Sequence, residues 1–265
     1  MLRARQQTHR HHRAWSRTTL RIGISLGVGA ISLAACGSSS SPSATTKIPL
    51  SGLAAEPAST ILATACAATF GAHSMAVAST FGVPSQVGGV AAMHWILTTG
   101  SNQGVVLYKG KGTAQAVIMP TISYLKGNQI YWSANATPPR PTAATSLASK
   151  WLSIPSSSAN NSLMTPIINF ASLQSLLLNC VPSIQPTKGR TGVVGSTPTV
   201  SLVIVSGGMT QTYFVATSGT PYIVKSTMTG GTTGNETAVL SGFNVQKVPH
   251  APTGSSPLDP LLAAS

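Results

Sequence analysis

Few residues of this chain have the type and spacing that acid–base or metal chemistry needs. The central part of the sequence carries two carboxylates, Glu56 and Glu236, which lie 180 positions apart. Hydrolysis by paired carboxylates needs two acids that flank one bond, and this spacing gives no sign of such a pair. His73, His94 and His250 show no metal-ligand spacing with one another or with a cysteine. We therefore predict no catalytic residue, no metal site and no cofactor.

A serine nucleophile is not supported either. The sequence contains no G-x-S-x-G elbow, and the S-x-x-K match at residues 123–126 lacks the S-D-N and K-T-G partners of that enzyme class. The match also falls in a stretch with strand character rather than at a helix start. A serine-rich chain produces such matches by chance, so we predict that the protein is not an enzyme.

Cys36, in contrast, has surroundings that predict a chemical modification. Residues 1–21 carry six arginines and no acid, and residues 22–35 form an apolar run of 14 residues. This run is shorter than the ~20 residues that span a bilayer, so it is typical of a secretory signal peptide. Its end, "LAAC", resembles a bacterial lipobox, whose cysteine receives diacylglycerol and becomes the new N-terminus. The alternative is an ordinary signal peptide with a chance cysteine.

The remaining composition predicts the order of segments along the chain. Two acyl chains hold a protein stably on a membrane, and a Ser-rich stretch after the cysteine is typical of a flexible tether. We predict a signal peptide over residues 1–35, a tether over 36–54, one folded domain over 55–252 and a loose tail over 253–265. The expected location is the outer face of a bacterial cell membrane, to which Cys36 anchors the protein.

The distribution of charge narrows the kinds of partner that the protein could bind. The signal peptide holds six of the 16 basic residues, which leaves ten basic and three acidic residues, a net charge of +7. The basic residues are scattered rather than gathered in a stripe, so we predict no nucleic-acid partner.

Cys66 and Cys180 remain after lipidation. Outside the cytoplasm such a pair tends to be oxidised, which favours a disulfide over two buried free thiols.

The hydrophobic period predicts an α+β fold. A helical pattern over residues 56–70 ends at Gly71, and a second helix is expected over 165–181. Short runs of β-branched and aromatic residues separated by glycine turns predict antiparallel strands. These runs cover residues 73–84, 88–100, 104–110, 113–125, 128–134, 189–195, 197–208, 209–221, 222–229 and 236–245. The runs 90–97 and 200–205 are apolar on both faces, which predicts that both faces are covered, by helices or by a ligand.

The order of these elements resembles that of LolA-like lipoproteins, in particular the LppX/LprG lipoproteins of mycobacteria and other actinobacteria. The stretches 193–226 and 240–252 carry most of the resemblance, which spans about residues 55–252. The resemblance implies a half-open antiparallel β-barrel of about 10–11 strands that wraps helices around a hydrophobic cavity. The Cys66/Cys180 pair is not a general feature of the family. If it joins two helices, it would restrict how far the cavity opens.

Members of that family bind acylated lipids and carry or present them across the cell envelope, so the resemblance implies a lipid or another hydrophobic ligand as partner. A membrane transporter is a further candidate partner. The alternative is a structural envelope lipoprotein without a ligand cavity. The expected cavity wall consists of large apolar side chains, each of which could equally be ordinary core: Met75, Phe81, Met93, Trp95, Ile118, Leu125, Tyr131, Leu176, Leu177, Val203 and Phe214.

Overall fold

One large sheet organises the protein. The computed structural model describes residues 52–82, 89–135, 141–157, 164–171, 177, 180, 185–230 and 234–258, which belong to a single compact unit. Its strands are β1 (Ser74–Phe81), β2 (Val90–Thr98), β3 (Asn102–Tyr108), β4 (Gly112–Ile118), β5 (Ile122–Gly127), β6 (Leu152–Pro155), β7 (Thr187–Val194), β8 (Thr197–Ser206), β9 (Met209–Ala216), β10 (Ile223–Gly230), β11 (Glu236–Ser241) and β12 (Ser256–Pro257). The helices are a 3₁₀ turn (Gly52–Ala55), α1 (Ala58–Phe70), α2 (Gln129–Asn135), α3 (Pro141–Leu147) and α4 (Thr165–Phe170).

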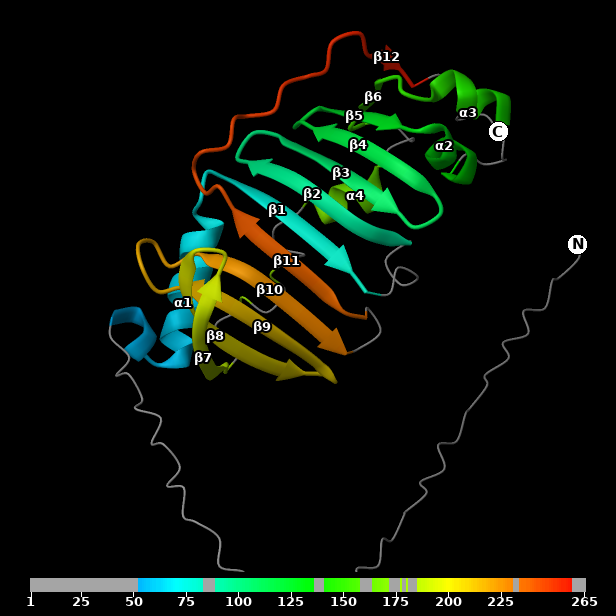
Figure 1. The fold of residues 1–265 in the computed structure, drawn as a ribbon. Coiled ribbons are helices and arrows are strands. Elements are labelled where there is room, and N and C mark those ends of the chain that lie inside the picture. The colour runs from blue at the N-terminus through cyan, green and yellow to red at the C-terminus, as the bar shows by residue number, and fades with distance from the viewer. Residues whose placement is uncertain are drawn as a thin grey trace, which may run out of the picture. The chain divides into compact units, whose positions relative to one another are not determined.

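The strand order joins two antiparallel meanders. It runs β12-β6-β5-β4-β3-β2-β1-β11-β10-β9-β8-β7, so strands from the two halves of the chain meet where β1 pairs with β11. Glycines with positive φ form the tight turns within each meander, for example Gly110 between β3 and β4 and Gly195 between β7 and β8. The order has two ends, so within the described residues the twelve strands form an open sheet that is not closed into a barrel (Figure 1).

Helices cover one face of this sheet. In Figure 1, α1 lies behind β8 to β10 and α4 lies behind β2 and β3. In β8, Val200, Leu202 and Ile204 are buried on this covered face, whereas Val205 is 73% exposed on the other. We call the covered face the inner face. The prediction that both faces are covered is therefore wrong for β8, since a single layer of helices protects only one side of an antiparallel sheet.

Two separate hydrophobic clusters pack on the inner face. The first joins side chains of β1 to β6 with α2, α3 and α4, and its largest fully buried member is Trp95. The second joins α1 and Leu177 to β8, β9 and β10, around Tyr213. Helices α2, α3 and α4 thus pack on the first meander, and α1 packs on the second.

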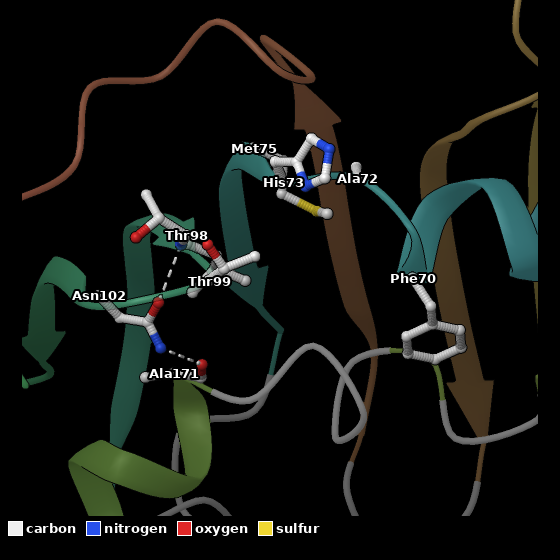
Figure 2. Close-up of a pocket in the computed structure, with 9 residues that line it drawn as sticks. Phe70, Ala72, His73, Met75, Thr98, Thr99, Asn102 and Ala171 are labelled. Carbon is white, nitrogen blue, oxygen red and sulfur yellow. Dashed lines mark hydrogen bonds between the residues drawn. The ribbon is translucent and has the colours of Figure 1, made fainter. Parts of the chain in front are cut away.

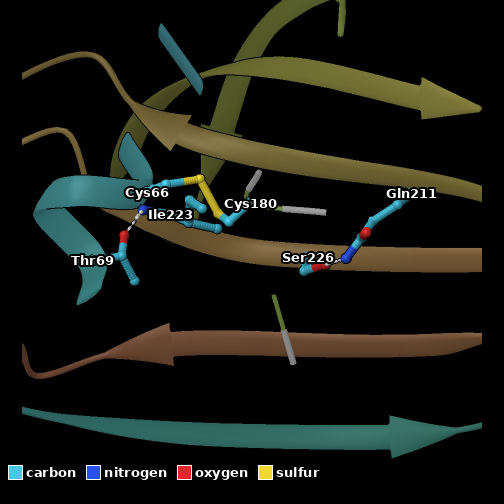
Figure 3. Close-up of a disulfide and its surroundings, with 6 residues drawn as sticks. All are labelled: Cys66, Thr69, Cys180, Gln211, Ile223 and Ser226. Carbon is cyan, nitrogen blue, oxygen red and sulfur yellow. Dashed lines mark hydrogen bonds between the residues drawn. A yellow bond between two sulfur atoms is a disulfide. The ribbon is translucent and has the colours of Figure 1, made fainter. Parts of the chain in front are cut away.

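Helix α1 is docked at an irregularity of β10. The register between β9 and β10 shifts between Ile223 and Lys225, and such a bulge leaves a backbone group without its ladder partner. The Oγ1 of Thr69 accepts the N–H of Ile223 at 2.9 Å (Figure 3). Thr69 lies on the buried side of α1 with Ile61, Leu62 and others. The hydrogen bond therefore fixes the end of α1 against the strand.

Substituting Thr69 by valine is expected to lower the free energy of unfolding by about 1–3 kcal/mol. The shape is kept, but the buried N–H of Ile223 loses its acceptor, and an unsatisfied buried donor costs that amount. Thr64→Val on the exposed side of the same helix is the matched control, with an expected change within ~0.5 kcal/mol. Denaturant unfolding of both variants measures the difference. Equal midpoints for the two variants would contradict the docking role.

Several predicted elements differ from the observed ones. Residues 128–134, predicted as a strand, form helix α2, which the side chain of Asn128 caps by accepting the N–H of Tyr131 at 2.8 Å. The run 113–125 is two strands, because Pro120 lies in the turn between β4 and β5. The helix predicted over 165–181 is observed as α4, and most of the residues that follow α4 in that range lie outside the described part of the chain.

The C-terminal tail is more ordered than predicted. Strand β12 pairs in parallel with β6, and Leu258 packs into the first hydrophobic cluster with 8% of its surface exposed. The prediction of a loose tail from residue 253 is therefore wrong for residues 256–258. Its physical cause is the free edge of β6, whose backbone groups accept one more short strand.

Candidate ligand-binding site

A hollow of about 260 Å³ opens on the inner face between the end of α1 and the end of α4 (Figure 2). Apolar side chains make up part of its wall, with Met75 and Leu97 from β1 and β2 and Phe70 from α1. The polar residues of its wall are His73, Thr98, Thr99 and Asn102, and the remaining members are Ala72 and Ala171. The hollow therefore presents an apolar surface together with hydrogen-bonding groups, which is the usual character of a small-molecule pocket.

Hydrogen bonds hold the wall of this hollow in place. The Oδ1 of Asn102 accepts the N–H of Thr98 at 3.0 Å, and its Nδ2 donates to the carbonyl of Ala171 at 3.3 Å (Figure 2). The second bond fastens the end of α4 over the sheet. On the opposite side, the N–H of His73 donates to the Oδ1 of Asn244 at 2.7 Å. The wall is thus built by segments that are far apart in the sequence.

Polar side chains continue along the inner face beyond the hollow. Ser79 lies four residues after Met75 on the same face of β1, about 13 Å further along the strand. Glu236 is the first residue of β11 and pairs with Phe81. Glu236 lies far from Glu56 in the sequence, and this wide spacing gave no reason to expect a functional site here. Glu236 shares one face of β11 with the buried Ala238 and Leu240, and this period of two is the sequence signal that places it on the inner face.

The next two strands extend this polar row. The Nε2 of Gln211 on β9 donates to the Oγ of Ser226 on β10 at 3.3 Å, and both side chains are buried (Figure 3). Ser226 pairs with Ala238 of β11, so it is a diagonal neighbour of Glu236. The polar row therefore crosses the inner face from β9 to β1, over strands whose other inward side chains belong to the two hydrophobic clusters.

Burial raises the pKa of the Glu236 carboxyl to about 7, and the neighbouring Ser79 hydroxyl opposes this rise. Because the folded state favours the neutral carboxyl, the resulting stabilisation is complete below the ordinary value of 4.5 and is lost as the pH rises through 7. We expect the free energy of unfolding to fall by up to ~3 kcal/mol between these limits. Denaturant unfolding at a series of pH values measures this slope.

Glu236→Gln should flatten this part of the pH profile, because the amide does not ionise. Glu56→Gln is the matched control, since Glu56 is exposed just before α1 and its substitution should leave the slope unchanged. A Glu236→Gln protein that retains the full slope would show that another group causes it.

The structure distributes the predicted cavity residues over three environments. Met75 lines the hollow. Most of the others pack in or against the two hydrophobic clusters on the inner face: Phe81, Met93, Trp95, Ile118, Leu125 and Tyr131 in the first, and Leu177 in the second. Leu176 lies outside the described residues.

Val203 and Phe214 do not lie on the inner face. Val203 alternates with the buried Leu202 and Ile204 of β8, and Phe214 alternates with the buried Tyr213 and Val215 of β9. On the outer face, the ammonium of Lys225 lies 5.3 Å from the centre of the Phe214 ring. Their assignment to a cavity on the inner face is therefore wrong, because each side chain points to the other side of its strand.

Cys66 of α1 and Cys180 form a disulfide (Figure 3), with their Cα atoms 5.7 Å apart. Cys66 belongs to the second hydrophobic cluster, and the half-buried Cys180 packs against it. The N–H of Cys180 donates to the carbonyl of Leu177, which is also buried in that cluster. The bond therefore fastens Cys180, and through its hydrogen bond Leu177, to α1 over the inner face.

The described residues hold no group of three or more His, Cys, Asp or Glu side chains that could bind a metal ion. Within the same residues, no helix has the length and apolar character to cross a bilayer.

The sequence matches no protein-family profile, and no curated protein is matched either. Among solved structures, LprF from Mycobacterium bovis is similar to this chain with a TM-score of 0.53 and 16% identity, covering 74% of this chain and 97% of LprF. The lipoprotein LppX of Mycobacterium tuberculosis gives a TM-score of 0.47 and 15% identity, over 72% of this chain and 97% of LppX. The match to LprF confirms, for the fold, the resemblance to mycobacterial lipoproteins that the sequence predicted.

Proposed function

We propose that this chain is a lipoprotein, anchored through Cys36 at the outer face of a bacterial cell membrane, that binds an acylated lipid or another hydrophobic ligand. It would carry or present this ligand across the cell envelope, and a membrane transporter is a candidate for the partner that receives it. The observation that carries the proposal is the open hollow between α1 and α4, on the apolar inner face of the sheet. The fold shared with LprF and the lipobox-like "LAAC" support it.

Lipid extraction from the purified full chain tests this function. Mass spectrometry of the extract should detect an acylated compound in a constant ratio to protein. The protein should also bind the neutral fluorescent probe N-phenyl-1-naphthylamine, whose emission rises in apolar surroundings. Purified lipids should displace the probe. A folded protein that carries no lipid and takes up no probe would contradict the proposal.

The small size of the hollow also agrees with one alternative, a structural envelope lipoprotein whose interior is fully packed. Ligand pockets usually measure ~300–1,000 Å³, and this hollow of about 260 Å³ lies just below that range. A packed interior predicts no probe binding at any concentration, whereas a carrier predicts saturable binding. The same titration therefore separates the two functions.

The anchor has its own test. Cys36→Ser removes the thiol that would receive diacylglycerol, so the protein should move from the membrane fraction to the soluble fraction and lose incorporation of labelled palmitate. Two acyl chains hold a protein on a bilayer whereas none does, so the expected effect is nearly complete. The double variant Cys66→Ala/Cys180→Ala is the control and should remain in the membrane fraction. Undiminished incorporation of labelled palmitate by Cys36→Ser would contradict lipidation at this residue.

A further inference from the structure

Four lysines that are spread along the sequence meet at one end of the first meander. Lys109 and Lys111 lie in the turn between β3 and β4. Lys126 lies near the end of β5, and Lys150 lies just before β6. Because neighbouring antiparallel strands run in opposite directions, all four positions belong to the same end of the sheet. Three of these lysines are exposed and Lys126 is half-buried. We call the four lysines the basic end.

Hydrogen bonds join the segments that carry these lysines. The N–H of Ser149 donates to the carbonyl of Gly127 at 3.0 Å, which places the chain before β6 against the end of β5. The N–H of Asn128 donates to the carbonyl of Thr113 at 3.1 Å, which places the end of β5 beside the start of β4. In Figure 1 the turn between β3 and β4 lies at the same end of the sheet as α2. The basic end is therefore a continuous surface that the fold assembles.

No carboxylate of the described residues offsets this charge. The sequence contains no acidic residue between Glu56 and Glu236. Glu56 precedes α1, which packs on the second meander. Glu236 lies on β11, which is three strand positions from β3, and its carboxyl is directed to the inner face. The basic end therefore has a positive potential, which favours an anionic partner.

Large apolar side chains are exposed beside these lysines. Leu107 on β3 is 46% exposed, and Ile130 on α2 is 57% exposed. Trp151 is half-buried, and the ammonium of Lys126 lies 5.8 Å from the centre of its ring. Lysines attract anionic headgroups, whereas aliphatic and indole side chains favour the boundary between headgroups and acyl chains. The combination fits a membrane surface, where a charged layer and an apolar layer adjoin.

The predicted anchor allows the basic end to reach a bilayer. Cys36 precedes Gly52, the first described residue, by 16 positions, and a chain of this length spans at most ~55 Å. The Nζ of Lys188 on β7 donates to the carbonyl of Ala54 at 3.0 Å, which holds this start of the domain at β7. Seven strand spacings separate β7 from β3, and at ~4.8 Å each they add up to ~34 Å. The tether is longer than this distance.

We infer that the basic end, together with Leu107, Ile130 and Trp151, docks the folded domain on a bilayer that contains anionic phospholipid. Each lysine close to such a surface raises the affinity about fivefold, so four of them give a dissociation constant of about 1 mM. This affinity orients a domain that the anchor already holds at the membrane, and it does not replace the anchor. The inference goes beyond the proposed function, because docking does not require that the hollow binds a ligand.

Docking would also set the height of the hollow above the bilayer. Val90 of β2 pairs with Tyr108, the residue next to Lys109. Leu97, in the wall of the hollow, lies seven residues further along β2, which corresponds to ~23 Å. The hollow and the basic end therefore lie at opposite ends of the same strands.

Sedimentation with lipid vesicles tests the docking. The test uses residues 37–265, which lack the signal peptide and the thiol of Cys36 and contain the whole compact unit Ile48–Ser265. At low salt this chain should bind vesicles of equal parts phosphatidylglycerol and phosphatidylcholine, and it should not bind phosphatidylcholine alone. Binding should weaken as the ionic strength rises to ~0.15 M, where charges are screened over ~8 Å.

Two double variants with the same loss of charge identify the surface. Lys109→Gln/Lys111→Gln should lower the affinity for the anionic vesicles about 25-fold, at about fivefold for each lysine. Arg190→Gln/Lys247→Gln is the matched control, because both side chains are exposed but lie elsewhere, on β7 and after β11. Its affinity should stay within about twofold of the wild type, since only charges close to the lipid contribute.

The fluorescence of Trp151 reports whether this surface faces the lipid. Trp95 and Trp132 are 0% and 3% exposed, so brominated phosphatidylcholine in the anionic vesicles should quench Trp151 and leave the other two unchanged. Trp151→Phe should still bind these vesicles, and its remaining emission should not be quenched.

Each alternative result would overturn the docking. Equal losses in the two double variants would mean that net charge attracts the vesicles, whichever surface carries it. Absence of quenching in the bound wild type, or quenching that persists in Trp151→Phe, would mean that another surface faces the lipid. No binding to the anionic vesicles at low salt would also show that the inference is wrong. These results do not involve the hollow, so a failure of docking remains distinguishable from a failure of the proposed function.

Discussion

Replacing Cys66 and Cys180 by alanine is expected to lower the free energy of unfolding by about 4–5 kcal/mol. The disulfide closes a loop with a sequence separation of 114 residues. Joining two positions so far apart restricts the unfolded chain more than a short loop would, and this restriction is the main source of the stabilisation. The bond also holds Leu177 over the second hydrophobic cluster, so its loss should loosen that end of the inner face.

Denaturant unfolding of the oxidised wild type and of the double variant measures this effect. Dithiothreitol provides the control, because it should lower the unfolding midpoint of the wild type towards that of the variant and leave the variant unchanged. Equal midpoints of the oxidised wild type and the double variant would mean that the disulfide contributes nothing to stability.

The sequence predicts the strands well where glycine turns separate runs of β-branched residues. The observed β8 and β9 lie within their predicted runs, and Gly207 and Gly208 form the turn between them with positive φ. Such turns are local, so their signal is present in a few neighbouring residues. The same local signal is misleading at residues 128–134, which it predicts as a strand and which form helix α2. There Ile130, Tyr131 and Trp132 have high strand propensity, and the helix depends on the cap that Asn128 provides.

Which face of a strand is buried could not be predicted from alternation alone. In β8, Val203 and Val205 are as apolar as Leu202 and Ile204, yet only the latter pair is fully buried. The choice depends on where α1 packs, and α1 contacts β9 and β10, which lie more than 100 residues further along the chain. A pattern in which both faces are apolar leaves this choice open, so Val203 and Phe214 were assigned to the wrong side.

The candidate site was the least predictable part, because it depends on how two meanders meet. Ser79 and Glu236 become neighbours only through the pairing of β1 with β11, which no local pattern reveals. Each residue taken alone reads as an ordinary strand or turn residue. A single carboxylate in the sequence predicts no site by itself, whereas in the fold burial raises the pKa of Glu236.

Gly104→Ala is expected to destabilise the protein by about 3 kcal/mol or more, since overpacking a core costs ~1–3 kcal/mol and contact with fixed backbone raises that cost. Gly104 on β3 pairs with Trp95, whose indole lies directly over it. A Cβ at this position would come within 2.3 Å of the Cδ2 of Trp95 and within 2.7 Å of the carbonyl oxygen of His94. The ring is fully buried and the carbonyl belongs to the strand ladder, so neither can move away easily.

Gly192→Ala on β7 is the matched control, because a Cβ there meets no atom within 4 Å. Thermal or denaturant unfolding should leave this control near the wild type and shift Gly104→Ala strongly. Trp95→Val should remove part of the penalty of Gly104→Ala, since the contact with the ring disappears while the one with the His94 carbonyl remains, and a double-mutant cycle measures that share. If Gly104→Ala were as stable as Gly192→Ala, the indole would not lie flat on β3.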